Sequence, residues 1–193
     1  FHVLSDRFIG AHSIMVSAHE RALLRERDVK VCHCPFSNCG KGVPETPALL
    51  EDGICVGLGT DGAAHGGLSL WNEMKIFRSV MNVKHGVAQS NPAIMLAAQI
   101  ISMVTKEGYH LMKEDGGIIA EGKKADFITI NIMQPHLYPT GNLVNTLLEC
   151  VTASDVCDMV VDRRLLMKNR EILTLDEEKI FYEAMKYMEE LEA

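Results

Sequence analysis

Three short apolar segments in the first third of the chain constrain the fold most, because each ends on polar residues. They are residues 7–12, 29–34 and 54–61, and segments with helix signals lie between them. Strands that are apolar along nearly their whole length are typical of parallel sheets covered by helices. We therefore predict consecutive strand–helix units of a parallel α/β fold in this part of the chain.

Local capping signals place the first two helices. Ser17 and Glu20 have the spacing of a capping box, which predicts a helix over residues 18–27. Residues 44–52 have the composition of a short helix, and Gly53 is suited to end it because glycine accepts the left-handed conformation.

Two longer helices are expected next. An apolar stripe at Leu70, Met74, Phe77 and Met81 predicts a helix that ends at Gly86. For the second, Asn91-Pro92 combines a capping residue with a proline at the first helical position, and the helix is expected to reach Tyr109. The stripe is interpreted as core packing.

The pattern changes near residue 115 from parallel α/β to antiparallel β. We predict two units, residues 1–115 and residues 116–193. The second is expected to contain strands and a terminal helix capped at Thr174 or Asp176. The predicted strands are residues 117–122, 125–130, 147–151 and 156–168, the last with a hairpin turn over 161–164.

The strand ends carry the candidate chemistry. Side chains at the C-terminal ends of parallel strands face the active site in such folds, and here these are His12, His33 and Asp61. A buried carboxylate is costly unless it is paired or bound to a metal. The alternative is that Asp61 caps the following turn through an Asx bond, as Asp-Gly pairs often do.

Four motifs in the same order resemble the amidohydrolase superfamily. Residues 11–13, 31–38 and 57–62 resemble its last three barrel strands, and residues 122–128 resemble its signature at the return to a small β-sandwich. Within the superfamily the motifs are similar to the branch of cytosine, guanine and methylthioadenosine deaminases and triazine chlorohydrolases. The resemblance implies the C-terminal part of a (β/α)8 TIM-like barrel, then β-sandwich strands and a terminal helix.

The resemblance also implies roles for single residues. Asp61 matches the eighth-strand metal ligand, which also accepts a proton from the metal-bound water. His12 matches the sixth-strand histidine that contacts the attacking hydroxide or the substrate, with metal ligation possible and a core histidine as the alternative. His33 lies where this branch often has a histidine near the substrate pocket, and Asn38 is expected to shape the following loop. His65 is an added candidate for substrate contact, against a solvated loop histidine.

The chain departs from the family in its metal ligands. The family holds one divalent metal, usually zinc or iron, with a His-x-His pair on the first strand and a histidine on the fifth. None of the eight histidines here forms a His-x-His pair, and none is followed three residues later by glutamate. We therefore expect the chain to be the C-terminal portion of a longer protein, inactive by itself.

The expected function is hydrolysis of a C–N or C–Cl bond in an aromatic nitrogen heterocycle by metal-activated water. The alternatives are a cyclic amide hydrolase and a catalytically inactive scaffold or binding module. A formal net charge of −7 argues against nucleic acid as a partner, and no apolar run reaches the roughly 18 residues that span a bilayer. We expect a cytoplasmic homo-oligomer with a small-molecule substrate.

The six cysteines are interpreted as reduced thiols. Cys32, His33, Cys34 and Cys39 invite a zinc reading, which is disfavoured because alternate strand residues point to opposite faces and no second Cys-x-x-Cys pair exists.

Overall fold

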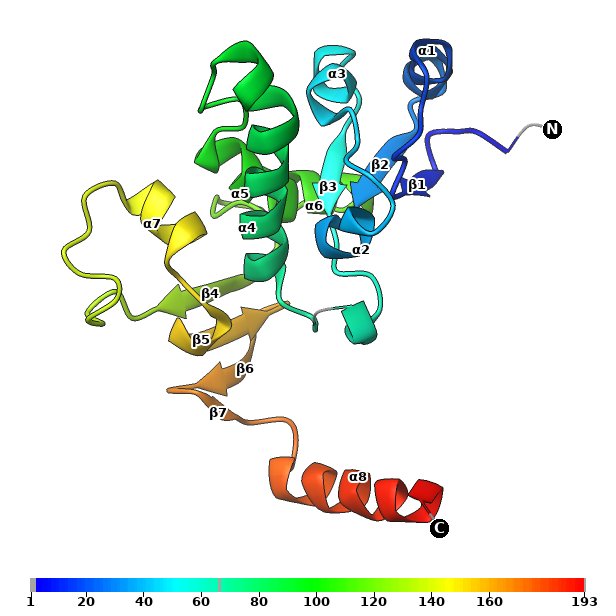
Figure 1. The fold of residues 1–193 in the computed structure, drawn as a ribbon. Helices are drawn as coiled ribbons and strands as arrows, with labels where there is room; N and C mark the ends of the chain where they lie inside the picture. The colour runs from blue at the N-terminus through cyan, green and yellow to red at the C-terminus, as the bar shows by residue number, and fades with distance from the viewer. Residues whose placement is uncertain (1–2, 66, 193) are drawn as a thin grey trace.

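The parallel sheet predicted from the sequence is present in the computed structural model, which describes residues 3–65 and 67–192 (Figure 1). Its strands are β1 (Ile9–Ala11), β2 (Lys30–His33) and β3 (Val56–Leu58), in the order β1-β2-β3. All pairs are parallel, with Val31 opposite Gly10 on one side and opposite Val56 on the other. The strands therefore present their C-terminal ends at one edge.

Helices connect the strands as expected. They are α1 (Ala18–Glu26), α2 (Pro35–Cys39) and α3 (Thr46–Glu51). The capping box is confirmed: the Ser17 backbone N–H donates to Glu20 Oε2 at 2.8 Å, and the Glu20 N–H donates to Ser17 Oγ at 3.3 Å. Gly53 has a φ of +78°, which fits its predicted role after α3. The sequence analysis did not predict α2, although Pro35 suits a first helical position.

The core lies between this sheet and a layer of helices. These are α4 (Leu70–Met81), continued by the π-helix Asn82–Gly86 and the 3-10 turn Val87–Gln89, then α5 (Ala97–Val104) and α6 (Lys106–Leu111). The predicted stripe on α4 is confirmed in the core for Met74, Phe77 and Met81, while Leu70 stays partly exposed. Val31 and Val56 meet it from the sheet, and both have no exposed surface.

The predicted start of the second long helix was wrong. The Asn91 side chain accepts the N–H of Ala93 at 3.0 Å and so builds a local turn, and α5 begins only at Ala97. Asparagine favours such side-chain-to-backbone bonds, which compete with helix initiation. The segment also breaks at Thr105, whose ψ of −95° separates α5 from α6.

The second sheet is antiparallel, in the order β4-β5-β6-β7. Its strands are β4 (Phe127–Ile130), β5 (Val156–Val161), β6 (Arg164–Lys168) and β7 (Glu171–Ile172). The predicted hairpin is confirmed, and Asp162 and Arg163 at its tip both have positive φ, as a type I′ turn requires.

The terminal helix α8 (Glu177–Glu192) is capped by Asp176, whose Oδ1 accepts the Lys179 N–H at 3.0 Å. In Figure 1, α8 lies apart from the other helices and strands. Among the described residues, none of the helices is long and apolar enough to cross a membrane.

Two predicted strands are corrected by the structure. Residues 147–151 lie mostly in a helix, α7 (Leu143–Glu149), because Asn142 caps its first turn and Leu148 packs into the core. Periodicity alone does not separate a short apolar strand from a buried helix. Residues 117–122 form no strand in the described chain, and Gly117 and Gly122 there both have positive φ.

The boundary between residues 1–115 and 116–193 stays a prediction. The two segments are linked, since the Trp71 indole N–H on α4 donates to the Leu147 carbonyl oxygen on α7 at 2.9 Å. Contacts of α7 with α4 and α5 bring it onto the helical layer of the first segment.

We predict that Phe77→Ala lowers the free energy of unfolding by about 3 to 5 kcal/mol, the usual cost of removing a buried aromatic ring. Phe77 is 1% exposed and stacks on His33 with ring centroids 6.4 Å apart. Urea unfolding followed by circular dichroism measures the change. Val83→Ala, at a position 74% exposed, is the control and should change it by less than about 0.5 kcal/mol. A loss of under about 1 kcal/mol for Phe77→Ala would contradict this packing.

Candidate functional site

The C-terminal ends of the three parallel strands bring His12, His33 and Asp61 together. His12 Nε2 lies 3.6 Å from Asp61 Oδ2, with about a third of each side chain exposed. His33 lies behind this pair, and its Nδ1 is 2.8 Å from the His12 carbonyl oxygen. The convergence follows from the parallel pairing, which places all three strand ends at one edge of the sheet.

The backbone at both facing residues is left-handed. His12 has a φ of 64° and Asp61 a φ of 58°, a region that residues other than glycine rarely adopt and that clusters at functional sites. Asp61 Oδ1 accepts the N–H of the next residue, Gly62, at 2.8 Å, whereas an Asx turn would bond the backbone two residues on. The other carboxylate oxygen faces His12. The expectation that this carboxylate is buried was wrong, because Asp61 follows β3 in an exposed loop.

His33 has no exposed surface. Its Nδ1–H donates to the His12 carbonyl, and the Thr46 hydroxyl donates to its Nε2 at 3.0 Å. Burial lowers the pKa of His33 to about 4, so the ring is neutral at neutral pH and its tautomer is set by these two partners. The substrate contact expected of His33 stays a prediction. In this structure the ring is buried and contacts His12 through the His12 carbonyl oxygen.

Asn38 has a closer relation to the site than the sequence analysis assigned to it. It is 2% exposed, and its Oδ1 accepts from His12 Nδ1 at 2.8 Å. With Nδ1 as the donor, His12 presents Nε2 towards Asp61. Within the described residues Asn38 Nδ2 has no hydrogen-bond partner. Asn38 belongs to the 31–38 motif, but a contact across 26 residues of sequence leaves no local signal.

Glu73 is a second residue that sequence reasoning missed. It lies on α4 among apolar side chains, is 1% exposed, and its Oε2 accepts the Phe36 backbone N–H at 2.8 Å. Burial raises the pKa of Glu73, and the nearby charge of Asp61 raises it further. The apolar stripe of α4 concealed it, because the helical pattern gives no reason to bury a carboxyl at this position.

His65 ends a 3-10 turn (Ala63–His65) in the loop that follows Asp61. Its side chain lies outside the described residues. Its proposed substrate contact therefore stays a prediction.

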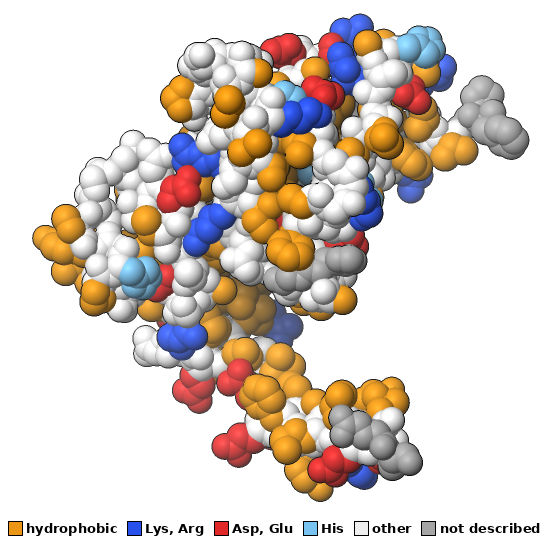
Figure 2. Space-filling model, in the orientation of Figure 1, with side chains coloured by type: hydrophobic (Ala, Val, Ile, Leu, Met, Phe, Trp, Pro, Cys, Tyr) orange, Lys and Arg blue, Asp and Glu red, His pale blue; other side chains and the backbone are white. Residues whose placement is uncertain are grey.

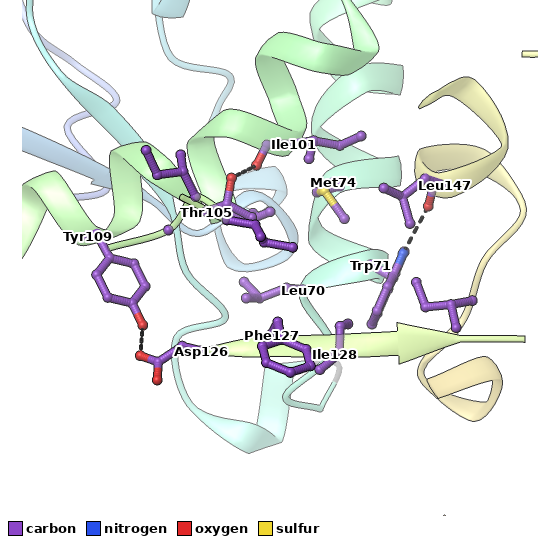
Figure 3. A pocket seen from close by; sticks show the side chains of 15 residues that line it. Leu70, Trp71, Met74, Ile101, Thr105, Tyr109, Asp126, Phe127, Ile128 and Leu147 are labelled. Carbon is purple, nitrogen blue, oxygen red and sulfur yellow. Dashed lines mark hydrogen bonds between the residues drawn. The ribbon is translucent and has the colours of Figure 1, made fainter. Parts of the chain in front are cut away.

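A cavity of about 460 Å³ lies elsewhere, between α4, α5 and β4 (Figure 3). Its walls are mainly apolar, with Trp71, Met74 and Phe127 among them. Its one carboxyl group, on Asp126, accepts a hydrogen bond from the Tyr109 hydroxyl. None of the strand-end residues lines this cavity, so it is separate from the His12–Asp61 pair.

Comparison with known families decides what kind of protein carries this arrangement. The model of the amidohydrolase family matches residues 1–165. The chain belongs to the amidohydrolase family. The predictions of this family and of a mixed α/β fold, which were based on the strand motifs, are thereby confirmed.

Several relatives in the family are deaminases. The 5-methylthioadenosine/S-adenosylhomocysteine deaminase of Dictyoglomus thermophilum is 41% identical over 95% of this chain and 43% of the relative. The 5'-deoxyadenosine deaminase of Methanosarcina acetivorans is 35% identical over 96% of this chain and 43% of the relative. The chain thus spans less than half the length of these curated relatives.

Solved structures share the fold. An adenosine deaminase from Xanthomonas campestris with bound zinc superposes with a TM-score of 0.91 at 22% identity, covering 98% of this chain and 44% of that one. The zinc-complexed atrazine chlorohydrolase of Arthrobacter aurescens superposes with a TM-score of 0.81 at 24% identity, covering 95% of this chain and 41% of that one. This chain therefore matches part of the barrel fold, and solved members of the family bind zinc.

We predict that His33 makes stability depend on pH on the acidic side. The unfolded chain takes up a proton near pH 6.5 and the folded chain only near pH 4, so the free energy of unfolding falls as pH drops through that window. NMR of the histidine rings should show His33 neutral between about pH 5 and 8. His33→Gln should remove this part of the pH dependence, whereas His19→Gln at an exposed position should retain it. A His33 ring that protonates near pH 6.5 would refute the burial argument.

Proposed function

We propose that this chain supplies His12 and Asp61 to the active site of a hydrolase that deaminates an aromatic nitrogen heterocycle. The observation that carries the proposal is the 3.6 Å approach of His12 Nε2 to Asp61 Oδ2 at the C-terminal ends of parallel strands. The deaminase relatives support the reaction type, and the substrates for which they are named support an adenine nucleoside, altered at the 5' position, as the substrate class. The chain is proposed to act within a longer polypeptide, since it spans 43% of those relatives.

The residues at the strand ends fit part of a divalent metal site. An imidazole nitrogen and a carboxylate oxygen are suitable ligands, and about a third of each side chain is exposed. Asp61 is the proposed ligand from this chain and does not complete a zinc site by itself, so the remaining ligands are proposed to come from the portion that the longer relatives have in addition. A divalent cation, when bound, polarises water and lowers its pKa to about 7. Zinc is favoured over iron because solved family members contain it.

The side chains of this chain are proposed to transfer protons and to orient the attacking oxygen or the substrate. Deamination adds water to the ring carbon and releases ammonia, so one proton must leave the water and one must reach the departing amine. Asp61 Oδ2 is proposed to accept the first proton and return it, a role suited to a partly exposed carboxylate. His12 is proposed to hold the attacking oxygen or the substrate through Nε2, while Asn38 fixes the ring from Nδ1.

The other candidate functions have less support. Likeness to the atrazine chlorohydrolase is at 24% identity and supports the fold alone, so dechlorination is not favoured over deamination. No particular residue in the described chain favours a cyclic amide substrate. An inactive scaffold would not account for the approach of His12 to Asp61 at the strand ends.

We predict that Asp61→Asn, in the full-length protein to which this chain belongs, removes nearly all deaminase turnover. The change keeps the shape of the side chain but removes the charge and the proton acceptor. Steady-state kinetics with a 5'-modified adenosine measures it, and metal content should fall as well. Asp115→Asn, an exposed carboxyl away from the site, is the control and should leave turnover unchanged. Retention of more than about a tenth of the activity would contradict the assignment. It would mean that the activation barrier rises by less than about 1.4 kcal/mol.

A second prediction distinguishes a His12 that acts on the attacking oxygen or the substrate from one that is a metal ligand or a core histidine. His12→Asn should lower kcat steeply while bound zinc stays close to stoichiometric and the circular dichroism spectrum stays unchanged. Metal analysis of the same sample gives the second readout. Loss of folding without a specific kinetic defect would instead identify His12 as a core histidine.

We further propose that the chain self-associates. The sheet order leaves β1 at an edge of the parallel sheet, and unpaired strand edges favour association. Apolar side chains also gather on α8 (Figure 2), where Phe181, Met185 and Leu191 are more than 60% exposed. We predict a dimer or larger species at micromolar concentration by sedimentation velocity, and a monodisperse monomer would contradict this.

A further inference from the structure

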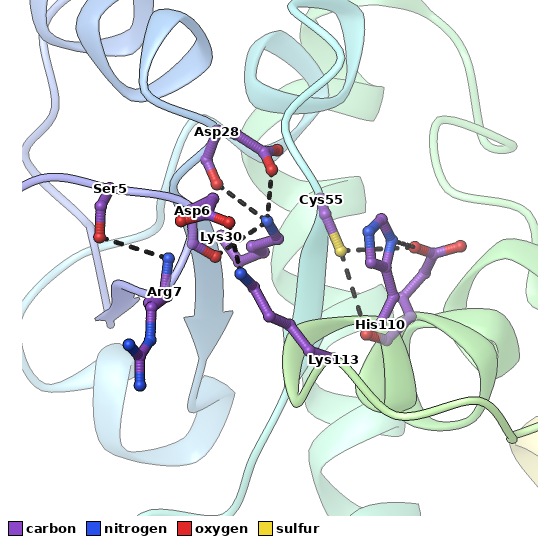
Figure 4. A network of polar contacts seen from close by, with 9 residues as sticks. Ser5, Asp6, Arg7, Asp28, Lys30, Cys55, His110 and Lys113 are labelled. Atoms are coloured by element: carbon purple, nitrogen blue, oxygen red, sulfur yellow. Dashed lines mark hydrogen bonds and ion pairs between the residues drawn. The ribbon is translucent and has the colours of Figure 1, made fainter.

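Cys55, Glu107 and His110 converge at the end of β3 opposite to Asp61 (Figure 4). Cys55 directly precedes β3, whereas Asp61 follows it, so the strand separates this cluster from the candidate active site. Glu107 and His110 lie three residues apart on α6, a spacing that puts both side chains on one face of a helix. The face is turned towards Cys55, and α6 contacts β3.

The donor atoms of this cluster have spacings that suit a common cation. Cys55 Sγ lies 3.4 Å from Glu107 Oε2, and His110 Nδ1 lies 3.6 Å from the same oxygen. All three donors lie within 4.8 Å of one another. Bond lengths of about 2.0 to 2.3 Å in a tetrahedral zinc site place neighbouring ligand atoms about 3.3 to 3.6 Å apart. The two distances to Glu107 Oε2 meet this spacing, and the third lies within the 4.8 Å limit.

The surroundings leave room and access for an ion. Cys55 and Glu107 are half-buried, and the His110 side chain is 60% exposed. A hollow of about 290 Å³ adjoins all three and is also lined by Gln99 and Ser102, which is space for a water as a fourth ligand.

We propose that Cys55, Glu107 and His110 form a second metal site that binds a divalent cation of the zinc type. The set of one sulfur, one nitrogen and one oxygen donor matches the ligands that zinc accepts, and the thiolate disfavours magnesium or calcium. Two lysines drawn near the cluster have acidic partners of their own (Figure 4). Lys30 Nζ lies 2.7 Å from Asp28 Oδ2, and Lys113 Nζ lies 2.5 Å from Asp6 Oδ2.

Binding at this site releases a proton. The Cys55 thiol donates a hydrogen bond to Glu107 Oε2 at 3.4 Å, so it carries its proton when no cation is bound. On binding, the S–H bond breaks, a sulfur–metal bond forms, and the proton passes to solvent. The cation takes the place of the thiol proton beside the Glu107 carboxylate.

Cobalt(II) added to the purified, metal-free chain tests the proposal, because a cysteine thiolate bound to cobalt gives a charge-transfer absorption in the near ultraviolet. We expect this band at one equivalent, with release of about one proton measured in weak buffer. His110→Ala, at an exposed position that tolerates truncation, should weaken binding by at least about a hundredfold, since loss of a residue that only orients a ligand already costs about ten- to a hundredfold. Cys55→Ser should remove the band.

Two control variants keep this result distinct from binding elsewhere. Asp61→Asn removes a donor at the other end of β3, and Cys39→Ser removes an exposed thiol, and both should leave the band unchanged. A band that survives Cys55→Ser, or no band in the unaltered chain, would overturn the proposal. Circular dichroism of each variant confirms that the fold is retained.

Discussion

Both the core and the candidate site depend on the contacts that the buried ring of His33 makes. One side of the ring stacks on Phe77 in the apolar core, and its two nitrogens bond to the His12 carbonyl and the Thr46 hydroxyl. A buried polar group left without a partner costs about 1 to 3 kcal/mol, so these bonds hold the chain after β1 against the start of α3. The left-handed backbone of His12 is therefore held by its hydrogen bond to the His33 ring, which stays neutral near neutral pH.

Much of the first sheet could be predicted because its determinants are local. The apolar runs, the Ser17–Glu20 box and Gly53 act within a few residues, and the structure uses each of them as the sequence suggested. Parallel pairing then requires that the polar residues after the strands meet at one edge. The proximity of His12 to Asp61 follows from that rule, whereas the geometry of the pair depends on residues that the rule does not name.

The features that escaped prediction depend on contacts between distant segments. Asn38 reaches His12 across 26 residues, and Glu73 on α4 receives the Phe36 backbone N–H from α2. Similarly, the apolar residues of α7 have the composition of a strand, but tertiary packing of Leu148 selects the helix. Neither propensity nor periodicity contains such information, since each position has an acceptable local alternative.

The neighbour-by-neighbour order of the parallel sheet has a consequence for how the protein folds. Each of the three strands pairs with the next one along the chain, so the strand-end residues are brought together by neighbouring strand–helix units. Loop-closure entropy grows with the length of the loop, so pairing each strand with its neighbour in sequence costs less than pairing strands that lie further apart would. The strand ends that carry His12, His33 and Asp61 therefore meet through the pairing of neighbouring units. The antiparallel sheet and α8 contribute none of these three residues.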